Sequence, residues 1–583
     1  MLSRNILGIV SLLVLLSPVF VHTLAMGQNQ QTYCPPTADP NNCHKVIIIG
    51  AGMAGLGAAK ELQSHGYDFV ILESNSLAGG RVFTGHGCSD IPKDPMCDNL
   101  TKINYDTHAS MISGFVGNPI TDLATLYNQS ENLRGHILLK TTNYTKSVTY
   151  DENGLVSPER QKRMADNYGA FKKWMNNTRQ NMTVDEPLQN AIDQFVQSQS
   201  FNESDTKDFA SEIAWNVGNE YADDPVNLSW KYWDKIGYRA GGDSGTDQVF
   251  PNGFGDIITG LVNDVNPNNI RYNTTVNHVN YADQGVTVET TNSTYYGQYV
   301  ISTIPIIALQ NSNFIEKMPS NKTNAVNNAT MGTLGQTYIY SKKGAFWDDV
   351  DWLYYVPSLN KTGQFVQFQN INRINGVPML LAFNYGNYAE KLLQSNQNKI
   401  KKDLLEVLGH MYPEKVSTDY THPDPNKVSL DDIIIVYRGE SPSYSSVPVN
   451  FIVPGDFNLL SSPLVDDNGK NRVFFAGEAT TWHYPQTTHG AYLTGLREAN
   501  RVMTTDTGKY PPTHIQYDYW RYPNSTMTKS WKAFPEYIIC HPGLMLVLKN
   551  NPTHDPLCKK PNVVPYLYEK HYIVDPSKAD PSP

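Results

Sequence analysis

Two short, uninterrupted apolar runs, residues 46–49 and residues 473–476, predict strands that are buried on both faces. A strand covered by helices on both sides shows such a run, whereas a half-exposed strand alternates apolar and polar residues. Each run leads into a glycine-containing turn and then into a stretch with helical spacing, residues 56–66 and residues 488–503. The pattern therefore predicts two strand-turn-helix units, one near each end of the chain.

The turn after the first run has the spacing of a dinucleotide-binding loop, with Gly50, Gly52 and Gly55. Glycines at these places allow a tight turn, close approach of a pyrophosphate and close packing of helix on strand, and a helix N-terminus favours phosphate. A further apolar run, FVILE, ends at Glu73, 21 residues after Gly52, where a carboxylate would accept hydrogen bonds from ribose hydroxyls. We therefore predict a dinucleotide site here.

The chain begins with a different apolar pattern. Arg4 precedes the apolar residues 6–21, and small residues follow as far as Ala25 and Gly27, the order of a signal peptide cleaved after one of these two. The alternative is an N-terminal membrane anchor, although the run is short for a span of ~20 residues and contains Pro18. Thirteen Asn-x-Ser/Thr sequons also favour export. We predict a secreted glycoprotein with no stable membrane span.

The predicted export also indicates which dinucleotide the chain binds. Nicotinamide cofactors dissociate after each turnover and need a cellular pool, whereas FAD is loaded once and retained, so FAD is the predicted cofactor. The stretch AGGRV would place Gly80 and Arg81 against its phosphates. Gly477 and Glu478, after the second apolar run, would present a carboxylate to a ribose or ribityl hydroxyl, and Gly495 in the next helix would allow contact with the flavin ring.

Composition and charge exclude some classes of partner and ligand. The formal net charge of −10 and the isoelectric point near 5.8 argue against nucleic acid as a partner and agree with a cationic substrate. The six cysteines form no CxxC pair, so no metal site is predicted. In an oxidising compartment we expect the three local disulfides 34–43, 88–97 and 540–558.

Four motifs in the same order make the chain resemble the flavin amine oxidase family, which includes polyamine oxidases, monoamine oxidases, L-amino-acid oxidases and histone lysine demethylases. The resemblance covers residues 45–505 and rests on VIIIGAGMAGLGAAKEL…FVILE, AGGRV, GVTVETTNSTYYGQYVISTIPIIALQ and FFAGEATTWHYPQTTHGAYLTGLREA. The segment NEYADDP is similar to a segment of polyamine oxidases. The resemblance implies oxidation of a C–N bond of a small-molecule amine to an imine, with hydride transfer to FAD, dioxygen as electron acceptor and hydrogen peroxide as product.

The resemblance also implies an α/β fold of the GR2 type, in which a Rossmann-like FAD-binding domain is interleaved with a mixed α+β substrate domain. Because the two strand-turn-helix units lie more than 400 residues apart, the first and last strands would share one sheet. We assign the signal peptide to residues 1–25, the FAD-binding domain to residues 44–110, 240–305 and 430–510, the substrate domain to residues 111–239 and 306–429, and a C-terminal extension to residues 511–583.

The chain departs from the family where a lysine near flavin N5 is expected, shortly before a Phe-Trp pair. Aligning MGTLGQTYIYSKKGAFW on Met331 and on its Phe-Trp pair places Gln336 at that position. Glutamine can hold a water but has no charge to assist the reaction with oxygen. The alternative is that Lys342 or Lys343 reaches inward. With Gln336 in place, a dehydrogenase or oxidative cyclase gains support over a fast oxidase.

Other predicted site residues follow from the same comparison. The polar position of the substrate channel falls on Ser113, and Glu220 in NEYADDP is the remaining acidic candidate, or a solvated acid at a helix end. The aromatic wall falls on Thr487, which would open the pocket to a longer substrate. Tyr444 would supply the other aromatic face, or pack in the core, and Thr488 would lie against the flavin pyrimidine.

Val279, on the strand before GVTVETT, completes the predicted cofactor-binding set, and His86 is either a candidate for covalent attachment of FAD or a surface imidazole. A secreted FAD-dependent amine oxidase of the polyamine-oxidase type is the leading prediction. The alternatives are a dehydrogenase or oxidocyclase of a secondary metabolite, an L-amino-acid oxidase, for which no arginine clamp is evident, and an FAD-bearing binding protein.

Overall fold

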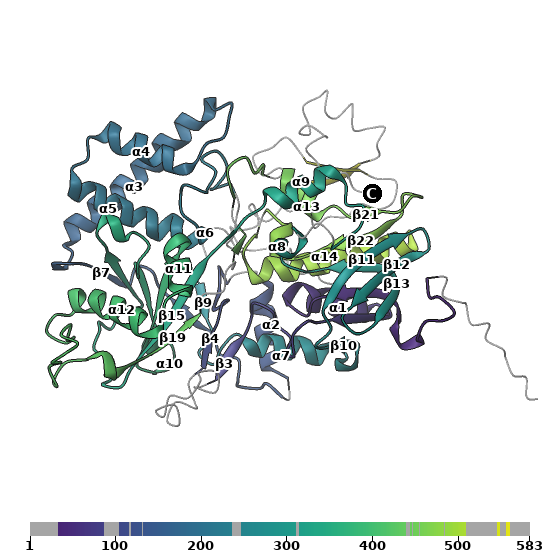
Figure 1. Cartoon of the computed structure of the whole chain (residues 1–583), viewed down its shortest axis with the longest axis horizontal. Coiled ribbons are helices and arrows are strands. Elements are labelled where there is room, and N and C mark those ends of the chain that lie inside the picture. Colours follow the sequence, from purple (N-terminus) through teal and green to yellow (C-terminus); the bar gives the residue numbers. More distant parts are fainter. Residues whose placement is uncertain are drawn as a thin grey trace, which may run out of the picture.

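A computed structural model describes residues 33–86, 104–115, 118–130, 132–235, 247–310, 314–438, 444–445, 447–453, 455–482, 484–508, 545–548 and 556–559. Two lobes lie side by side, each built on a large sheet (Figure 1). One lobe contains α1 (Met53–Ser64) and α14 (Thr488–Thr507), and the other contains α3 (Pro158–Thr178) and α12 (Gln397–Met411). The predicted signal peptide lies outside the described residues, and the predicted domain boundaries stay predictions.

The first sheet joins the two ends of the chain. Strands β1 (Cys43–Ile49) and β22 (Asn471–Phe475) both pair in parallel with β13 (Thr294–Ser302), which confirms that the first strand and the last share one sheet. The order is β10 (Ile270–Arg271), β2 (Phe69–Leu72), β1, β13, β12 (Gly285–Thr290) and β11 (Val276–Ala282), with β22 paired to β13 and β21 (Leu464–Val465) paired to β22. This sheet positions the predicted dinucleotide turn.

Burial on both faces explains the uninterrupted apolar run of β1. Val46 and Ile48 pack in a core that also contains α1 and α14, whereas Ile47 and Ile49 pack in a second core on the opposite face. The run of residues 46–49 is thus correctly predicted as a doubly buried strand. The helix α1 begins three residues earlier than the predicted range, because the chain becomes helical directly after Gly52.

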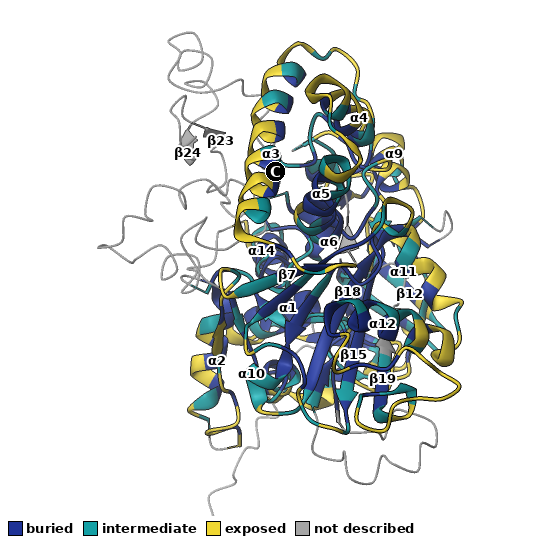
Figure 2. Cartoon of the chain, turned by 90° about the vertical axis from the view of Figure 1, so that its left-hand side faces the viewer, coloured by how far each residue is buried: buried dark blue, intermediate teal, exposed yellow. Residues whose placement is uncertain are grey.

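The second sheet has one packed face and one face that lines a cavity. Ile339, Leu353 and Leu380 point to the core beneath α12, while their neighbours point the other way, toward α3 and α5 (Glu203–Ile213). The order is β19 (Ile433–Arg438), β15 (Leu334–Ser341), β18 (Met379–Tyr385), β17 (Gln367–Asn370), β16 (Trp352–Val356), β7 (Ser147–Asp151) and β8 (Gly154–Leu155). Figure 2 shows β15 and β18 buried and the outer side of α3 exposed.

Shorter elements complete the two lobes. The small sheets are β3 (Thr84–His86) with β4 (Asn104–Asp106), β5 (Met111–Ile112) with β9 (Asp247–Val249) and β6 (Lys140–Thr142), β14 (Met331–Gly332) with β20 (Tyr444–Ser445), and β23 (Met545–Leu548) with β24 (Pro556–Lys559). The other helices are α2 (Pro119–Asn128), α4 (Leu188–Gln199), α6 (Asn219–Tyr221), α7 (Gly255–Asp264), α8 (Ile306–Leu309), α9 (Ser320–Asn328), α10 (Ile371–Asn375), α11 (Gly386–Leu393) and α13 (Gly455–Ser461). A π-helical turn, Ala214–Gly218, joins α5 to α6.

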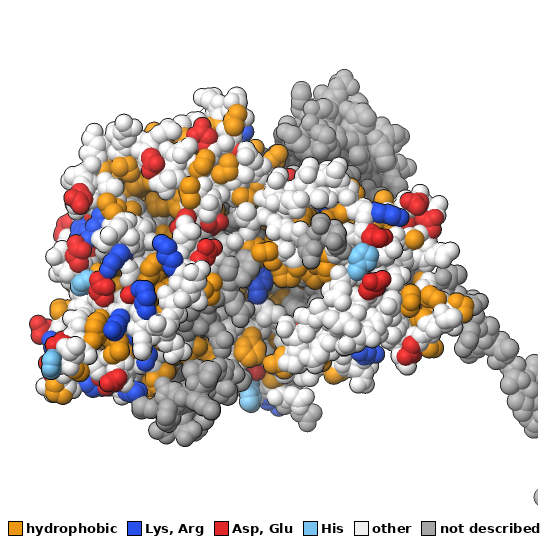
Figure 3. All heavy atoms as spheres, viewed as in Figure 1, with side chains coloured by type: hydrophobic (Ala, Val, Ile, Leu, Met, Phe, Trp, Pro, Cys, Tyr) orange, Lys and Arg blue, Asp and Glu red, His pale blue; other side chains and the backbone are white. Residues whose placement is uncertain are grey.

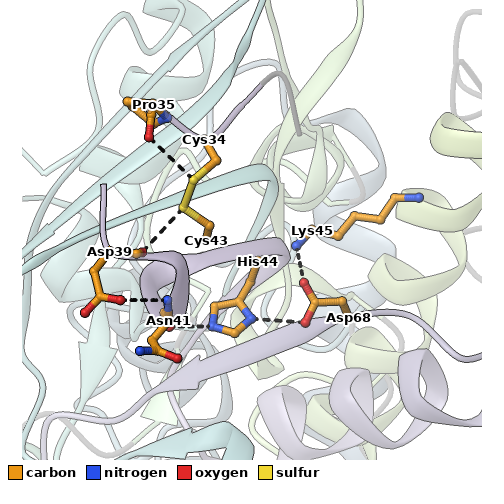
Figure 4. Close-up of a disulfide and its surroundings, with 8 residues drawn as sticks. All are labelled: Cys34, Pro35, Asp39, Asn41, Cys43, His44, Lys45 and Asp68. Carbon is orange, nitrogen blue, oxygen red and sulfur yellow. Dashed lines mark hydrogen bonds and ion pairs between the residues drawn. A yellow bond between two sulfur atoms is a disulfide. The ribbon is translucent and has the colours of Figure 1, made fainter. Parts of the chain in front are cut away.

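A disulfide between Cys34 and Cys43 closes the loop before β1, which confirms one of the three predicted pairs (Figure 4). The other predicted pairs involve Cys88, Cys97, Cys540 and Cys558, whose side chains lie outside the described residues. Beside this disulfide, the ring of His44 on β1 contacts the Asn41 oxygen of the loop at 3.0 Å and the carboxylate of Asp68 at 3.1 Å. The loop is therefore fastened to the first sheet by covalent and polar contacts.

Acidic and basic side chains are interspersed on the face shown in Figure 3, most densely over the lobe of α3 and α12. Among the residues that the structure describes, no helix has the length and apolar character needed to cross a bilayer. The same residues contain no cluster of three or more His, Cys, Asp or Glu side chains suited to a metal ion.

Candidate active site

The glycine turn between β1 and α1 has the geometry that its sequence predicts. Gly50 has φ +100°, a conformation that side chains rarely adopt, and its N–H donates to the Leu72 oxygen at 2.8 Å. A Cβ on Gly55 would lie 1.9 Å from the Gly50 oxygen, so only glycine fits there. Gly52 precedes α1 as its N-cap, and no side chain caps the helix. The first turn of α1 therefore presents backbone N–H groups without a side-chain acceptor.

Glu73 at the end of β2 is 5% exposed and binds the turn itself. Its Oε2 accepts a hydrogen bond from the Ala51 N–H at 2.7 Å, and its Oε1 accepts from the Asn75 N–H at 2.8 Å. Oε1 also accepts from Asn75 Nδ2 at 3.0 Å and from Ser74 Oγ at 3.3 Å, so it is fully used. Oε2 accepts only one bond from the described residues and keeps a lone pair for a ribose hydroxyl. Glu73 thus fixes the shape of the turn as well as being the predicted ribose acceptor.

Residues from both ends of the chain meet beside this turn. Gly79 forms a parallel bridge with Gly52, which brings the Gly-Gly-Arg segment against the turn. Arg81 Nη1 donates to Glu478 Oε1 at 3.1 Å, and Glu478 is buried and also accepts from the Gln486 N–H at 2.9 Å. Two residues predicted independently as cofactor-binding thus form an ion pair.

Two predicted contacts with the cofactor have a packing role in the structure. Val279 on β11 is fully buried in the hydrophobic core, and its backbone pairs with Phe314 and Glu316. A Cβ on Gly495 would lie 2.0 Å from the Ala54 oxygen, so this glycine allows α14 to pack closely on α1. The prediction that Gly495 serves contact with the flavin ring is therefore replaced by a helix-packing role.

A cavity of about 660 Å³ lies in the second lobe, between the open face of the second sheet and helices α3 and α5. It reaches the start of α14, and its lining residue Gln486 contacts Glu478, so it adjoins the glycine turn region. Predicted site residues found in its lining are Ser113, Glu220, Gln336, Thr487 and Thr488. Tyr444 lies on β20, paired with Gly332 of β14, and its side chain is outside the described set.

Gln336 on β15 is the predicted substitute for the family lysine, and it lines the cavity. It is 2% exposed, and its Nε2 donates to the His108 oxygen at 3.0 Å. Its Oε1 is buried with no hydrogen-bond partner among the described residues. Lys342 and Lys343 instead bond to backbone oxygens at the protein surface, which overturns the alternative that one of them reaches inward.

Thr487 and Thr488 stand at the start of α14. Thr487 is the N-cap of the helix: its Oγ1 accepts from the Gly490 N–H at 2.9 Å and donates to the Tyr484 oxygen at 2.9 Å. The hydroxyl is therefore already used to hold the helix end, and the methyl group and backbone remain for the cavity wall. Thr488 is the first helical residue and also lines the cavity.

The cavity also contains acidic groups that the sequence analysis did not single out. Glu212 at the end of α5 is 8% exposed, and burial raises its pKa to about 7. Asp247 is buried as well, but it accepts from the Gly114 N–H and from the Tyr144 hydroxyl, so its role is structural. One lysine, Lys172 of α3, joins them in the lining.

The residues present fit FAD as the cofactor. A Cβ on Gly80 would meet only the Gly52 Cα, at 3.7 Å, so the backbone here is accessible to a phosphate beside the uncapped start of α1. Glu73 and Glu478 supply buried carboxylates for hydroxyl groups. The unpartnered oxygen of Gln336 marks the place in the cavity where a polar group is needed.

Comparison with curated proteins gives relatives that match most of this chain. "Protein FLOWERING LOCUS D" of Arabidopsis thaliana is 29% identical over 470 residues, which cover 78% of this chain and 54% of that protein. "Lysine-specific histone demethylase 1 homolog 1" of Arabidopsis thaliana is 27% identical over 466 residues, covering 79% and 52%. "Lysine-specific histone demethylase 2" of Homo sapiens is 25% identical over 483 residues, covering 79% and 54%. The chain spans about half the length of these relatives.

The family model of flavin-containing amine oxidoreductases matches residues 53–503, which is more than half of the chain. The match begins at the first residue of α1, includes the whole second sheet and ends within α14. It therefore covers both the cavity and most of the residues around the glycine turn. The chain belongs to the flavin-containing amine oxidoreductase family.

Proposed function

We propose that this enzyme oxidises a small aliphatic amine of the polyamine class, uses dioxygen as electron acceptor and works after export. The observation that supports the substrate class is the charge of the cavity lining. The lining contains three acidic residues, Glu212, Glu220 and Asp247, and one lysine, Lys172, and the lining residues described include no arginine. Such a lining favours a cationic amine and disfavours an amino acid, whose carboxylate would need a cation.

FAD held beside the glycine turn would supply the acceptor for a hydride equivalent from the carbon next to the amine nitrogen, and water would hydrolyse the resulting imine. The chain supplies a dry, shaped site for this chemistry. Gln336 Oε1 is placed to accept one hydrogen bond from an amine N–H or from a water, and that bond orients the nitrogen without charging it. An uncharged amine is the better hydride donor, so a neutral amide suits this position.

Export is supported by three features. The first residues have the order of a signal peptide, and sequons recur along the chain. Cys34 and Cys43 form a disulfide, the state expected in an oxidising compartment. A protein that meets such a compartment and retains FAD agrees with an oxidase that acts outside the cell.

The names of the relatives point to a second kind of amine. Several are named lysine-specific histone demethylases, so by name they act on a lysine side chain of a histone. A free polyamine and an alkylated lysine share an amine at the end of an alkyl chain. We favour the free amine because two glutamates in the lining, the buried Glu212 and the partly exposed Glu220, suit a molecule with several charges. A peptide substrate is one outcome of the test.

Gln336 favours a second candidate function, a dehydrogenase that passes electrons to another acceptor. An uncharged side chain at this place offers no electrostatic assistance to reduction of dioxygen. The amine half of the reaction would be the same. Only the second half, re-oxidation of the flavin, distinguishes the two candidates.

The test is to add spermidine to the purified yellow protein without oxygen, to follow the flavin absorbance, and then to admit air. Bleaching with rapid recovery and release of hydrogen peroxide is the expected result. Bleaching with slow recovery would establish the dehydrogenase instead. If spermidine causes no bleaching but a dimethyl-lysine peptide does, the free-amine proposal is wrong.

A further inference from the structure

The floor of the cavity is a straight row of side chains across four neighbouring strands. Gln336 of β15 lies opposite Phe383 of β18, Phe383 lies opposite Gln367 of β17, and Gln367 lies opposite Tyr354 of β16. All four line the cavity. Because neighbouring strands are ~4.8 Å apart, the three steps place Gln336 and Tyr354 ~14 Å from each other. The cavity is therefore long enough for an extended chain molecule.

Glu212 lies at the Tyr354 end of this row. Helix α5 packs on β16, and the ring of Trp215, three residues after Glu212, lies 5.0 Å from the ring of Tyr354. The charge of Glu212 also helps to raise the pKa of the Tyr354 hydroxyl, after burial, which is the larger cause. Gln336 and Glu212 thus stand at opposite ends of one cavity.

The π-helical turn places Glu212 and Glu220 on the same side of their helix. Residues eight apart on an α-helix differ in direction by ~80°, because each residue turns the helix by ~100°. A π turn contains one extra residue, so the pair behaves as if seven apart and the difference falls to ~20°. Both carboxylates therefore face the cavity, about two turns or ~11 Å apart along the wall.

Glu212 has a hydrogen bond but no ion pair in the described part of the chain. Its Oε2 accepts from Asn216 Nδ2 at 2.9 Å, and no protein group there donates to Oε1. The neighbouring Asp208, in contrast, is paired with Arg160 at 2.6 Å. Lys172 lines the same cavity and its charge lowers the pKa of Glu212, but these two described side chains form no ion pair. A buried carboxylate without a direct ionic partner lowers stability, so a cation that arrives with a ligand would find an available partner.

We propose that Glu212 binds the distal cation of a linear diamine or polyamine whose reacting nitrogen lies at the Gln336 end. This inference rests on the proposed function and specifies its substrate: an amine with a second ammonium group ~14 Å from the first. Trp215, Tyr168 and Tyr354 add aromatic surface near the carboxylate, which suits an alkyl ammonium group. Glu212 is then a specificity residue, and the hydride transfer occurs at the other end of the cavity.

The test compares 1,10-diaminodecane with n-decylamine, which differ only in the second amino group. Apparent affinity is measured in two ways, from the amine dependence of anaerobic flavin bleaching and from the amine dependence of the melting temperature. The enzyme should prefer the diamine by about tenfold or more, and Glu212→Gln should remove that preference by weakening binding of the diamine. Asp166→Asn, an exposed charge change on α3, is the matched control and should keep the preference.

Two results would overturn the inference: no diamine preference in the unmodified enzyme, or a preference that survives in Glu212→Gln. Should Glu212→Gln fail to fold, Asn216→Ala provides the second test, because it removes the donor to Glu212 from an exposed position. The loss of diamine preference at low pH should then begin at a higher pH. If no amine bleaches the flavin while the melting temperature still responds to the diamine, the proposed function fails and the cation site stands.

Discussion

The glycine turn and the cavity are built in opposite ways. The turn is a local structure: Gly50, Gly52, Gly55 and Glu73 lie within one strand-turn-helix-strand unit, and backbone geometry determines their identities. The cavity takes its walls from α3, α5, the π turn and five strands of the second sheet. Its side chains meet only in the folded protein. A turn that only certain residues can form is recognisable in the sequence by the spacing of those residues. Side chains that come together from distant elements have no such spacing.

The largest effect is expected from a change in the turn. Gly55→Ala would place a Cβ 1.9 Å from the Gly50 oxygen, so the turn must open, and the protein should lose nearly all bound FAD. The measurement is the ratio of flavin to protein absorbance after purification. The control is Gly169→Ala in α3, where the added Cβ meets nothing within 4 Å and should stabilise the helix by about 0.5–1 kcal/mol. Equal flavin content in the two variants would contradict the role of the turn.

The second prediction concerns stability and pH at Glu212. Burial raises its pKa from 4.5 to about 7, so the folded state loses stability as pH rises between these values and the full penalty is present above pH 7. Glu212→Gln should therefore stabilise the protein by up to about 3 kcal/mol above pH 7 and by little at pH 4. The groups that face Glu212 and enter this balance are Asp208 and Asn216 on its own helical segment, Tyr168 and Lys172 on α3, and Tyr354 on β16.

Denaturant unfolding of both proteins at several pH values measures this difference. Asp166→Asn, which changes an exposed charge, should show no comparable dependence. If Glu212→Gln stabilises the protein equally at pH 5 and at pH 8, the difference in unfolding free energy comes from packing and not from the buried charge.

A third prediction concerns the effect of adding a positive charge at position 336, at the other end of the cavity. Gln336→Lys keeps a donor toward the His108 oxygen and adds a positive charge, so recovery of the flavin absorbance in air should become about tenfold faster. Stopped-flow mixing of the bleached enzyme with oxygenated buffer gives this rate. Gln367→Lys, two strands away in the same row, is the control. If both variants speed recovery equally, the position of Gln336 is not special.

The smallest effect is expected at Thr487. Thr487→Ala removes the hydroxyl that caps α14 and should cost about 1 kcal/mol, whereas Thr487→Ser keeps it and should cost little. Thermal unfolding of the two variants separates them. Equal melting temperatures of the two variants would contradict the capping role of the Thr487 hydroxyl and leave only its place in the cavity wall.

The sequence was a good guide wherever the backbone itself was constrained. The doubly buried strand at residues 46–49, the shared sheet of the first and last strands and the pair 34–43 were predicted and are confirmed. Gln336 was placed by counting from a distant Phe-Trp pair, and the structure puts it in the cavity. The first two predictions followed from patterns along the chain, whereas that of Gln336 followed from the resemblance to the flavin amine oxidase family.

Residues whose role depends on a neighbour far away in sequence were missed or misassigned. From the sequence, a glycine at position 495 could serve either contact with a flavin ring or close packing of two helices. The structure shows helix packing, because the Ala54 oxygen lies 2.0 Å from where a Cβ would be. Glu212 and Glu220 differ by eight positions, which on a regular helix would point them in different directions. No residue type in this segment predicts the extra residue of a π turn. The common direction of Glu212 and Glu220 could therefore not be predicted from the sequence.

The pairing of Arg81 with Glu478 joins residues that are 397 positions apart, and it has a consequence for biosynthesis. Strand β22, which leads into Glu478, joins the sheet through β13, so the two cofactor-binding segments cannot meet before β22 has been synthesised. Such long-range pairing slows folding. A site that takes residues from both segments can therefore capture FAD only after the ribosome has passed Glu478.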